Sequence, residues 1–152
     1  MEGNIGYIRN VSLFKALQEN ELKLLSSHLS THEFNEGETV IHEFEKSNAL
    51  YILVEGRVKV VLKEADGKEI VMEELGPDQF FGEMGLLDGK PRSADVVCIP
   101  RCRMLRLDRE DFYEVVKRNP SILHSLVIEL CDRLRRANDM IKGVNISQMY
   151  IY

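Results

Sequence analysis

The chain has 152 residues, of which 44% are hydrophobic and 30% are charged, and its formal net charge is -5. A chain of this length buries about two thirds of its unfolded surface, so we expect one globular domain covering residues 1–152. The acidic balance gives no overall attraction for nucleic-acid phosphates or acidic membranes, and no apolar run approaches the roughly 20 residues that span a bilayer.

The cysteines indicate a reducing compartment. Cys98, Cys102 and Cys131 are too few and too scattered for a disulfide framework, and no secretory signal precedes them. We therefore expect a cytoplasmic protein without membrane contact.

The first part of the chain is predicted to be helical. Leucine and phenylalanine recur at spacings of three and four from Leu13 to Leu29, which predicts short N-terminal helices within residues 8–33. From Phe34 the pattern changes to short alternating segments, and the strongest turn signals between them are Glu55-Gly56 and Asp66-Gly67. Strands are expected at 50–54, 57–62, 70–75, 94–99 and 103–107. Residues 34–107 are thus predicted to form an antiparallel jelly-roll barrel, also called a double-stranded β-helix, in an α+β fold.

Two helices are expected after the barrel, within residues 108–142. Asp108 can cap a helix over 109–118, and Asn119 can cap a longer helix that has Pro120 in its first turn and ends near Lys142. Residues 143–152 are expected to be a hinge or tail. Apolar residues of the long helix follow steps of four and three, which predicts a narrow dimer seam after the first, docked turns. Its members are Val127, Leu130, Leu134, Ala137 and Ile141.

The segment "FFGEMGLLDGKPRSADVV", residues 80–97, carries the chemistry that points to a ligand. Gly82 and Gly85 let a ligand approach backbone N–H groups at the start of a short helix closely. Arg92 offers a planar fork of donors that suits a phosphate, and the Ser93 hydroxyl adds a neutral donor. Glu83 cannot bind the same phosphate, but its carboxylate can accept hydrogen bonds from sugar hydroxyls. Together they describe a nucleotide site; the alternative is an internal salt bridge between Glu83 and Arg92.

Phe-Gly-Glu-Met-Gly-Leu-Leu followed by Pro-Arg-Ser-Ala resembles the phosphate-binding cassette of cyclic nucleotide-binding domains. These domains occur in the catabolite activator protein (CRP/FNR) family of bacterial transcription regulators, in protein kinase regulatory subunits and in gated channels. The resemblance runs from about residue 8 to the end of the chain, with the cassette at residues 80–94. It implies that Glu83 holds the ribose 2'-hydroxyl, that Arg92 and Ser93 hold the cyclic phosphate, and that Gly82 and Gly85 make close backbone contacts. It also implies an apolar wall formed by Val60 and Leu75.

The resemblance departs from the family where the long helix meets the base. Arg133 matches the arginine of the bacterial regulators, but Ala137 and Asn138 stand where they have a pair of hydroxyl residues. Ala137 cannot hydrogen-bond the base with its side chain, whereas Asn138 offers a donor and an acceptor that suit adenine or guanine. The effector implied is therefore cAMP or cGMP, and the base stays open.

Regulators of this family continue through a hinge into a helix-turn-helix domain, which is the DNA-binding element of the family's namesake. Here "KGVNISQMYIY" resembles the start of that hinge and no second domain follows in this chain. We expect a homodimeric sensor portion of a longer regulator that would contact DNA only through a domain not present here. The alternative is a dimerisation scaffold of the same fold that binds no ligand or another effector.

Enzymatic and metal sites are not expected. The four histidines, His28, His32, His42 and His124, lack the paired spacing of a metal-binding barrel, and the Cys98 and Cys102 pair lacks further ligands. The sequence therefore predicts no catalytic residues and no metal.

Overall fold

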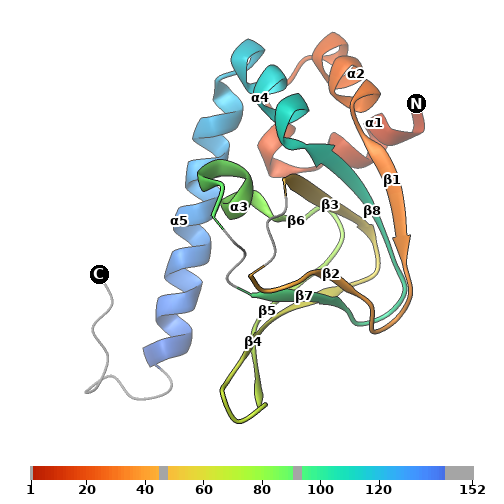
Figure 1. The fold of residues 1–152 in the computed structure, drawn as a ribbon. Helices are drawn as coiled ribbons and strands as arrows, with labels where there is room; N and C mark the ends of the chain where they lie inside the picture. Colours follow the sequence, from red (N-terminus) through yellow and green to blue (C-terminus); the bar gives the residue numbers. More distant parts are fainter. Residues whose placement is uncertain (1, 45–47, 91–93, 143–152) are drawn as a thin grey trace.

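The computed structural model describes residues 2–44, 48–90 and 94–142, and it combines helices with two β-sheets (Figure 1). Three helical elements come first: α1 (Glu2–Ile8), the 3-10 turn η1 (Ser12–Phe14) and α2 (Glu19–Ser27). A short helix, α3 (Glu83–Asp88), interrupts the strands, and α4 (Arg109–Arg118) and α5 (Ser121–Lys142) follow them. The mixed composition confirms the predicted α+β class.

Eight antiparallel strands of the described residues form the barrel. One sheet has the order β1-β8-β3-β6, and its strands are β1 (Ser30–Phe34), β8 (Cys102–Asp108), β3 (Ala49–Glu55) and β6 (Phe80–Phe81). The other has the order β2-β7-β4-β5, and its strands are β2 (Thr39–Ile41), β7 (Asp95–Cys98), β4 (Val58–Lys63) and β5 (Glu69–Leu75). The two sheets enclose the barrel interior, which confirms the jelly-roll prediction (Figure 1).

Strand β3 separates two hydrophobic cores because successive side chains of a strand point to opposite faces. Leu50 and Ile52 pack into a core shared with the N-terminal helices, α4 and the start of α5. Tyr51 and Leu53 face the other way, into the core inside the barrel. Both faces of β3 are therefore covered, and its residues from Ala49 to Leu53 are all buried.

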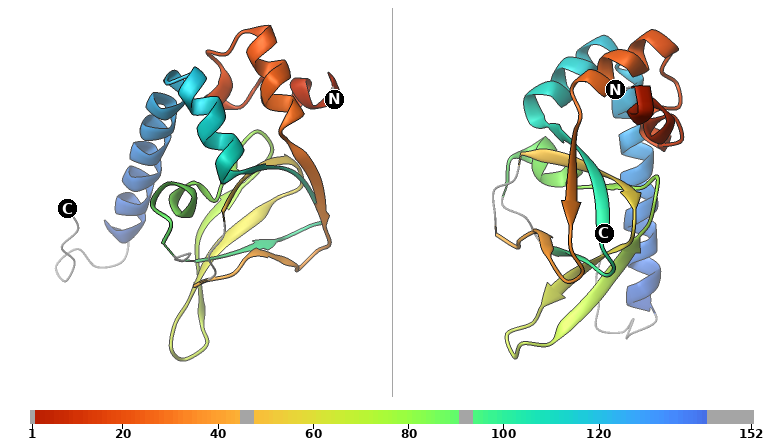
Figure 2. Two further views of the ribbon diagram at one scale, coloured as in Figure 1. Left: turned by 45° about the horizontal axis from the view of Figure 1, so that its top comes forward. Right: turned by 90° about the vertical axis from the view of Figure 1, so that its right-hand side faces the viewer.

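The two predicted turns each connect strands that are consecutive in the chain. Asp66-Gly67 lies in the hairpin between β4 and β5, which extends from one end of the barrel (Figure 2). Gly56 joins β3 to β4 with φ +94°, and a Cβ there would lie 2.5 Å from the Arg101 carbonyl oxygen and 2.8 Å from Cys102 Sγ. Only glycine satisfies both the backbone angle and this close approach.

The helices cover one end and one side of the barrel. Helices α1, α2 and α4 gather at one end, and α5 runs from that end along the side of the molecule (Figures 1 and 2). Ile122 and Leu126 bury the first turns of α5 in the helical core, as expected. This places the later turns of α5 beside the corner between β6 and α3.

Several predicted boundaries need correction. The N-terminal helices do not reach residue 33, because β1 begins at Ser30; its first residues, Ser-Thr-His-Glu, lack the apolar alternation that would have signalled a strand. The helices also begin before residue 8, at Glu2. Asp108 stands at the N-cap position of α4, but its side chain makes no cap hydrogen bond and accepts one from Arg106 Nε at 2.9 Å instead. The predicted hinge, residues 143–152, lies outside the described residues.

Among the helices that the structure describes, none combines the length and apolar character needed to cross a membrane.

Candidate functional site

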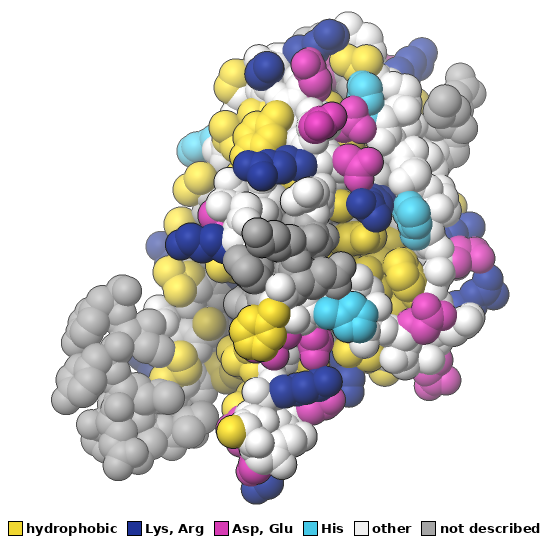
Figure 3. Space-filling model, viewed as in Figure 1, with side chains coloured by type: hydrophobic (Ala, Val, Ile, Leu, Met, Phe, Trp, Pro, Cys, Tyr) yellow, Lys and Arg dark blue, Asp and Glu magenta, His cyan; other side chains and the backbone are white. Residues whose placement is uncertain are grey.

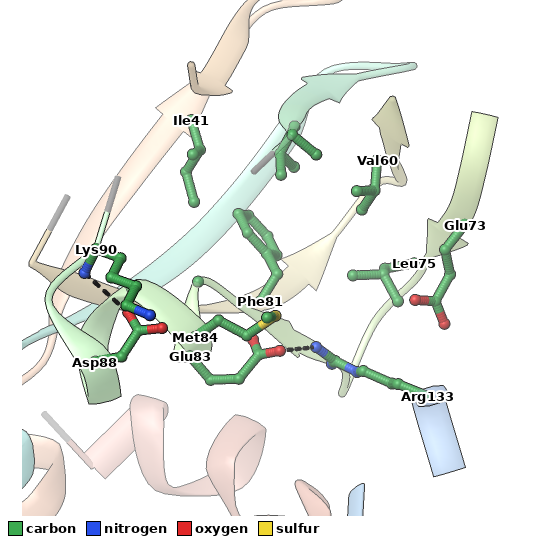
Figure 4. Close-up of a pocket in the computed structure, with 14 residues that line it drawn as sticks. Ile41, Val60, Glu73, Leu75, Phe81, Glu83, Met84, Asp88, Lys90 and Arg133 are labelled. Atoms are coloured by element: carbon green, nitrogen blue, oxygen red, sulfur yellow. Dashed lines mark hydrogen bonds and ion pairs between the residues drawn. The ribbon is translucent and has the colours of Figure 1, made fainter. Parts of the chain in front are cut away.

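A cavity of about 410 Å³ lies between the β4–β5 side of the barrel, the α3 corner and α5 (Figure 4). Asp88 and Lys90 lie at one end of it, and Val60, Leu75 and Glu73 lie at the other. Its described lining consists of Ile41, Val60, Glu73, Leu75, Phe81, Gly82, Glu83, Met84, Gly85, Asp88, Lys90, Ala94, Val96 and Arg133. The cavity is therefore mostly apolar, with a few charged groups, as small-molecule sites usually are.

The turn from β6 into α3 places Glu83 against this cavity. Gly82 adopts φ +93° at the start of α3, a left-handed conformation that favours glycine and turns the chain directly from strand to helix. Leu86 is fully buried and holds α3 against the core. Glu83 is consequently only 4% exposed, which is unusual for a carboxylate and requires a charged or hydrogen-bonding partner.

That partner is Arg133, which α5 contributes from fifty residues further along the chain. Its Nη1 lies 2.6 Å from Glu83 Oε1, its Nη2 donates to the Phe80 carbonyl oxygen, and its guanidinium lies 4.7 Å from the centre of the Phe80 ring. Its Nε also donates to Glu129 Oε1 at 3.3 Å. Arg133 thus satisfies the buried carboxylate and joins α5 to the corner between β6 and α3 (Figure 4).

The ion pairs continue along α5 toward the barrel. Arg136 lies 3.8 Å from Glu129, and its Nη2 lies 2.9 Å from Glu73 Oε1 on β5. A second cavity of about 460 Å³ lies there, and it shares Val60, Glu73 and Arg133 with the first. The two cavities therefore adjoin one another between β5 and α5.

Most of the predicted site residues in the described ranges come together. The first cavity is lined by six of them, namely Val60, Leu75, Gly82, Glu83, Gly85 and Arg133. Asn138 does not line either cavity, and its Oδ1 is buried without a hydrogen-bond partner among the described residues. Arg92 and Ser93, predicted to hold the phosphate, lie outside the described residues, so the alternative pairing of Glu83 with Arg92 also stays untested.

The prediction missed Glu73, which lines both cavities. A signal was present, because residues two apart on a strand share a face and Leu75 had already been assigned to the cavity wall. The irregular pairing of β4 with β5 made that signal harder to use. Val60 pairs with Glu73 but Val61 pairs with Val71, which leaves Met72 as an extra residue in β5. Such a bulge redirects neighbouring side chains.

The predicted dimer seam divides into two groups. Val127 and Leu134 are 55% and 58% exposed. Leu130, by contrast, is half-buried against the helical core, and Ala137 lines the second cavity. Ile141 is half-buried. The outer face of α5 is therefore apolar at Val127 and Leu134, whereas Leu130 and Ala137 already contact their own chain.

The cysteine pair is buried. Cys98 and Cys102 are each 1% exposed, and Cys102 Sγ donates to the Arg57 carbonyl oxygen at 3.2 Å. Burial, assisted by a hydrogen bond with Cys102, raises the pKa of the Cys98 thiol to about 12. In the described ranges no three His, Cys, Asp or Glu side chains gather in a way that could hold a metal ion.

The chain is similar in sequence and in fold to known proteins. The chain is 33% identical over 126 residues to the cyclic AMP receptor protein of Thermus thermophilus. This match covers 83% of this chain and 58% of that protein. The crystal structure of Thermus thermophilus catabolite activator protein matches with a TM-score of 0.78 and 32% identity, covering 88% of this chain and 62% of that one. The N-terminal domain of a transcriptional regulator from Streptomyces coelicolor matches at 28% identity with a TM-score of 0.71. The match covers 95% of this chain and 99% of that one.

The chain thus spans about three fifths of the length of the curated relatives it matches. A family model for the cyclic nucleotide-binding domain matches residues 31–119, from β1 to the end of α4. The matched residues include the turn that carries Glu83. They also include every described residue that lines the first cavity except Arg133, which lies on α5. The chain belongs to the cyclic nucleotide-binding domain family, with relatives among the CRP-type regulators.

Proposed function

We propose that this chain is the effector-binding sensor domain of a CRP/FNR-type transcription regulator, that it binds cAMP or cGMP, and that α5 relays binding. The observation that carries the proposal is the contact between Glu83 and Arg133 at the edge of a cavity of about 410 Å³. A residue of the cassette and a residue of the long helix meet there at one buried carboxylate. No catalytic role is assigned to any residue.

Each part of the ligand has a place in this proposal. The ribose 2'-hydroxyl donates to Glu83, while Arg92 and Ser93 hold the cyclic phosphate and Gly82 and Gly85 let it approach the backbone. Val60 and Leu75 contact the apolar faces of the base. Asn138 has a side chain that can also bond a base edge, and its Oδ1 has no partner among the described residues.

The proposed relay rests on Glu83, which has Arg133 as a partner in the structure and would gain the ribose as a second partner in the proposed complex. Arg133 already occupies one of its oxygens, and a ribose hydroxyl would add a donor to the same group. Ligand and helix then influence each other through this carboxylate. A binding event shifts the position of α5 only to the extent that the ligand prefers one position over another.

In this proposal, a change in DNA binding would be the response to the ligand. It requires a second copy of the chain and a further domain. Val127 and Leu134 expose an apolar strip on the outer face of α5, which supports a homodimer through this helix. The relatives named above are described as a receptor and activator protein, and this chain covers about three fifths of their length. DNA would be contacted only through a domain outside this chain.

Calorimetric titration of the purified protein with cAMP and cGMP tests the proposal. Saturable binding of one of them is expected, and Arg92→Ala should weaken it by about ten- to hundredfold because a charge-assisted contact to phosphate is lost. Arg101→Ala is a suitable control, since Arg101 is 68% exposed and pairs with Glu33 on the barrel surface. Unchanged binding by Arg92→Ala would contradict the site assignment.

A ligand-free dimerisation scaffold is the second candidate. It is favoured by one observation: the Glu83 carboxylate already has a charged partner, Arg133, within its own chain. A dimer in sedimentation experiments that binds neither cyclic nucleotide would establish this alternative.

A further inference from the structure

Glu73 lines the end of the first cavity that lies opposite Asp88 and Lys90. Figure 4 shows Glu73 with Val60 and Leu75 at one end of the first cavity, away from Asp88 and Lys90. Lys90 lies just before the predicted phosphate-binding residues in the chain, so a nucleotide held by Glu83 at its ribose directs its base to the opposite end. The β-bulge at Met72 sets the side chain of Glu73 beside Val60 at that end.

The surroundings of Glu73 make its carboxylate an acceptor for this base. Its side chain is 27% exposed, and Arg136 contacts only one of its oxygens, Oε1, at 2.9 Å. Within the described residues, Oε2 makes no hydrogen bond or ion pair of its own. Two other polar side chains of the adjoining cavities have partners: Gln79 Oε1 accepts from the Gly76 backbone N–H at 2.8 Å, and Arg133 is held by Glu83.

A carboxylate accepts hydrogen bonds and donates none, so it discriminates between bases by their N–H groups. Adenine carries a 6-amino group and guanine carries a 2-amino group. A purine without an exocyclic amino group lacks this donor, and hypoxanthine keeps only its ring N1–H. The half-buried carboxylate then forgoes a charge-assisted hydrogen bond to the amino group. The apolar side chains of Val60 and Leu75, which line the first cavity, would contact any purine alike and give no such selection.

We propose that Glu73 is a specificity residue that accepts a hydrogen bond from the exocyclic amino group of the base. The site then selects amino-bearing purines, adenine or guanine, over purines that lack this group. The inference rests on the proposed function, because it needs a cyclic nucleotide in the first cavity. Arg136 acts as a positioning residue that holds the carboxylate from α5.

The experiment compares dissociation constants for four ligands: cAMP, its analogue with hydrogen in place of the 6-amino group, cGMP, and cIMP, which lacks the 2-amino group of cGMP. The wild-type protein should bind the preferred amino nucleotide about ten- to hundredfold more tightly than its amino-free counterpart. Glu73→Ala should bring that ratio close to one. Glu73→Gln, which keeps an acceptor but loses the charge, should leave a ratio of a few fold.

Glu69→Ala is the matched control, since Glu69 lies on the same strand, is 44% exposed and pairs with Lys59 at 3.7 Å. It should retain the wild-type ratio. Arg136→Ala should lower the ratio, but by less than Glu73→Ala does, because it removes the group that positions the carboxylate and leaves the carboxylate itself. A ratio that survives Glu73→Ala, or one that disappears only in Arg136→Ala, overturns the assignment of Glu73. Failure of the wild-type protein to bind either cAMP or cGMP overturns the proposed function itself, and the role of Glu73 with it.

Discussion

Glu83 and Arg133 form a largely buried ion pair between α3 and α5. Each is largely buried, with side-chain exposures of 5% and 14%, so each depends on the other for solvation. Removing one member leaves the other charge buried without its partner, which is more costly than replacing both with apolar groups.

Arg133→Ala is therefore expected to lower the free energy of unfolding by about 3 kcal/mol, measured by urea titration. Arg135→Ala, on the same helix, should change it by less than about 0.5 kcal/mol because Arg135 is 78% exposed. The double variant Glu83→Leu with Arg133→Met should recover part of the loss. Equal effects of Arg133→Ala and Arg135→Ala would show that the buried pair contributes nothing.

The three cysteines are expected to differ in reactivity. Cys131 is exposed, whereas Cys98 and Cys102 are buried and the pKa of Cys98 is raised to about 12 by that burial. Because the thiolate is the nucleophile, a maleimide at pH 7.5 should label Cys131 quickly and the other two only after unfolding. Mass spectrometry of the labelled protein with and without urea measures this. Rapid labelling of all three in the folded protein would be inconsistent with the packing.

The same pKa shift has a consequence for stability. The folded protein holds the Cys98 proton more tightly than the unfolded chain does. The neutral thiol therefore contributes to the free energy of unfolding, and this contribution is complete below the ordinary thiol pKa. It decreases as the pH rises toward about 12.

At the scale of elements, α5 has one apolar side buried in the core and another that is exposed. Its first turns are buried in the core through Ile122 and Leu126, while Val127 and Leu134 remain exposed on the outer side. If the exposed strip is a dimer contact, Leu134→Glu should convert the dimer to a monomer in sedimentation experiments, because a charge in the seam loses apolar contact and repels its symmetry mate. Arg135→Glu, which lies outside the seam, should remain dimeric. A wild-type protein that is monomeric at high concentration would rule out the seam.

The sequence predicted the elements that have a local signal. Glycine turns and alternating residues located β3, β4, β5, β7 and β8, and the Asn119-Pro120 pair marked the boundary between α4 and α5. Strand β1 was missed because its residues are polar. Strands β2 and β6 were missed because three and two residues are too few for a periodicity. At the site, Glu83 and Arg133 were each predicted from motif, but their contact depends on how α5 docks and has no local signal. Glu73 was missed because a bulge interrupts the regular pairing of its strand.

At the scale of the whole molecule, the sequence carries 20 basic and 25 acidic side chains. Figure 3 shows acidic and basic side chains interspersed on one face, which agrees with a formal net charge of only -5. Binding is thus expected to depend on the interior of the cavity and less on long-range attraction.

A bound cyclic nucleotide should raise the melting temperature of the whole domain. Ligand at about a hundred times its dissociation constant adds about 2.7 kcal/mol, which corresponds to roughly 5 to 10 °C for a domain of this size. Differential scanning fluorimetry with cAMP and cGMP measures the shift, and the non-cyclic 5'-monophosphates serve as controls. An equal shift with the non-cyclic nucleotides would argue against a site shaped for the cyclic phosphate.

Helix α5 is attached to the rest of the molecule by different contacts at its two ends, which has a consequence for how it can move. Apolar burial fixes it near Leu126, whereas beyond that point the ion pairs of Arg133 and Arg136 connect it to the barrel. Arg133 lies about 10 Å from Leu126 along the helix axis, and Lys142 lies about 24 Å from it. For a rigid helix that pivots near Leu126, a displacement at Arg133 more than doubles by the time it reaches Lys142. A movement of ångström size beside the first cavity would thus become a larger displacement at the end of the helix, where an attached domain could respond to it.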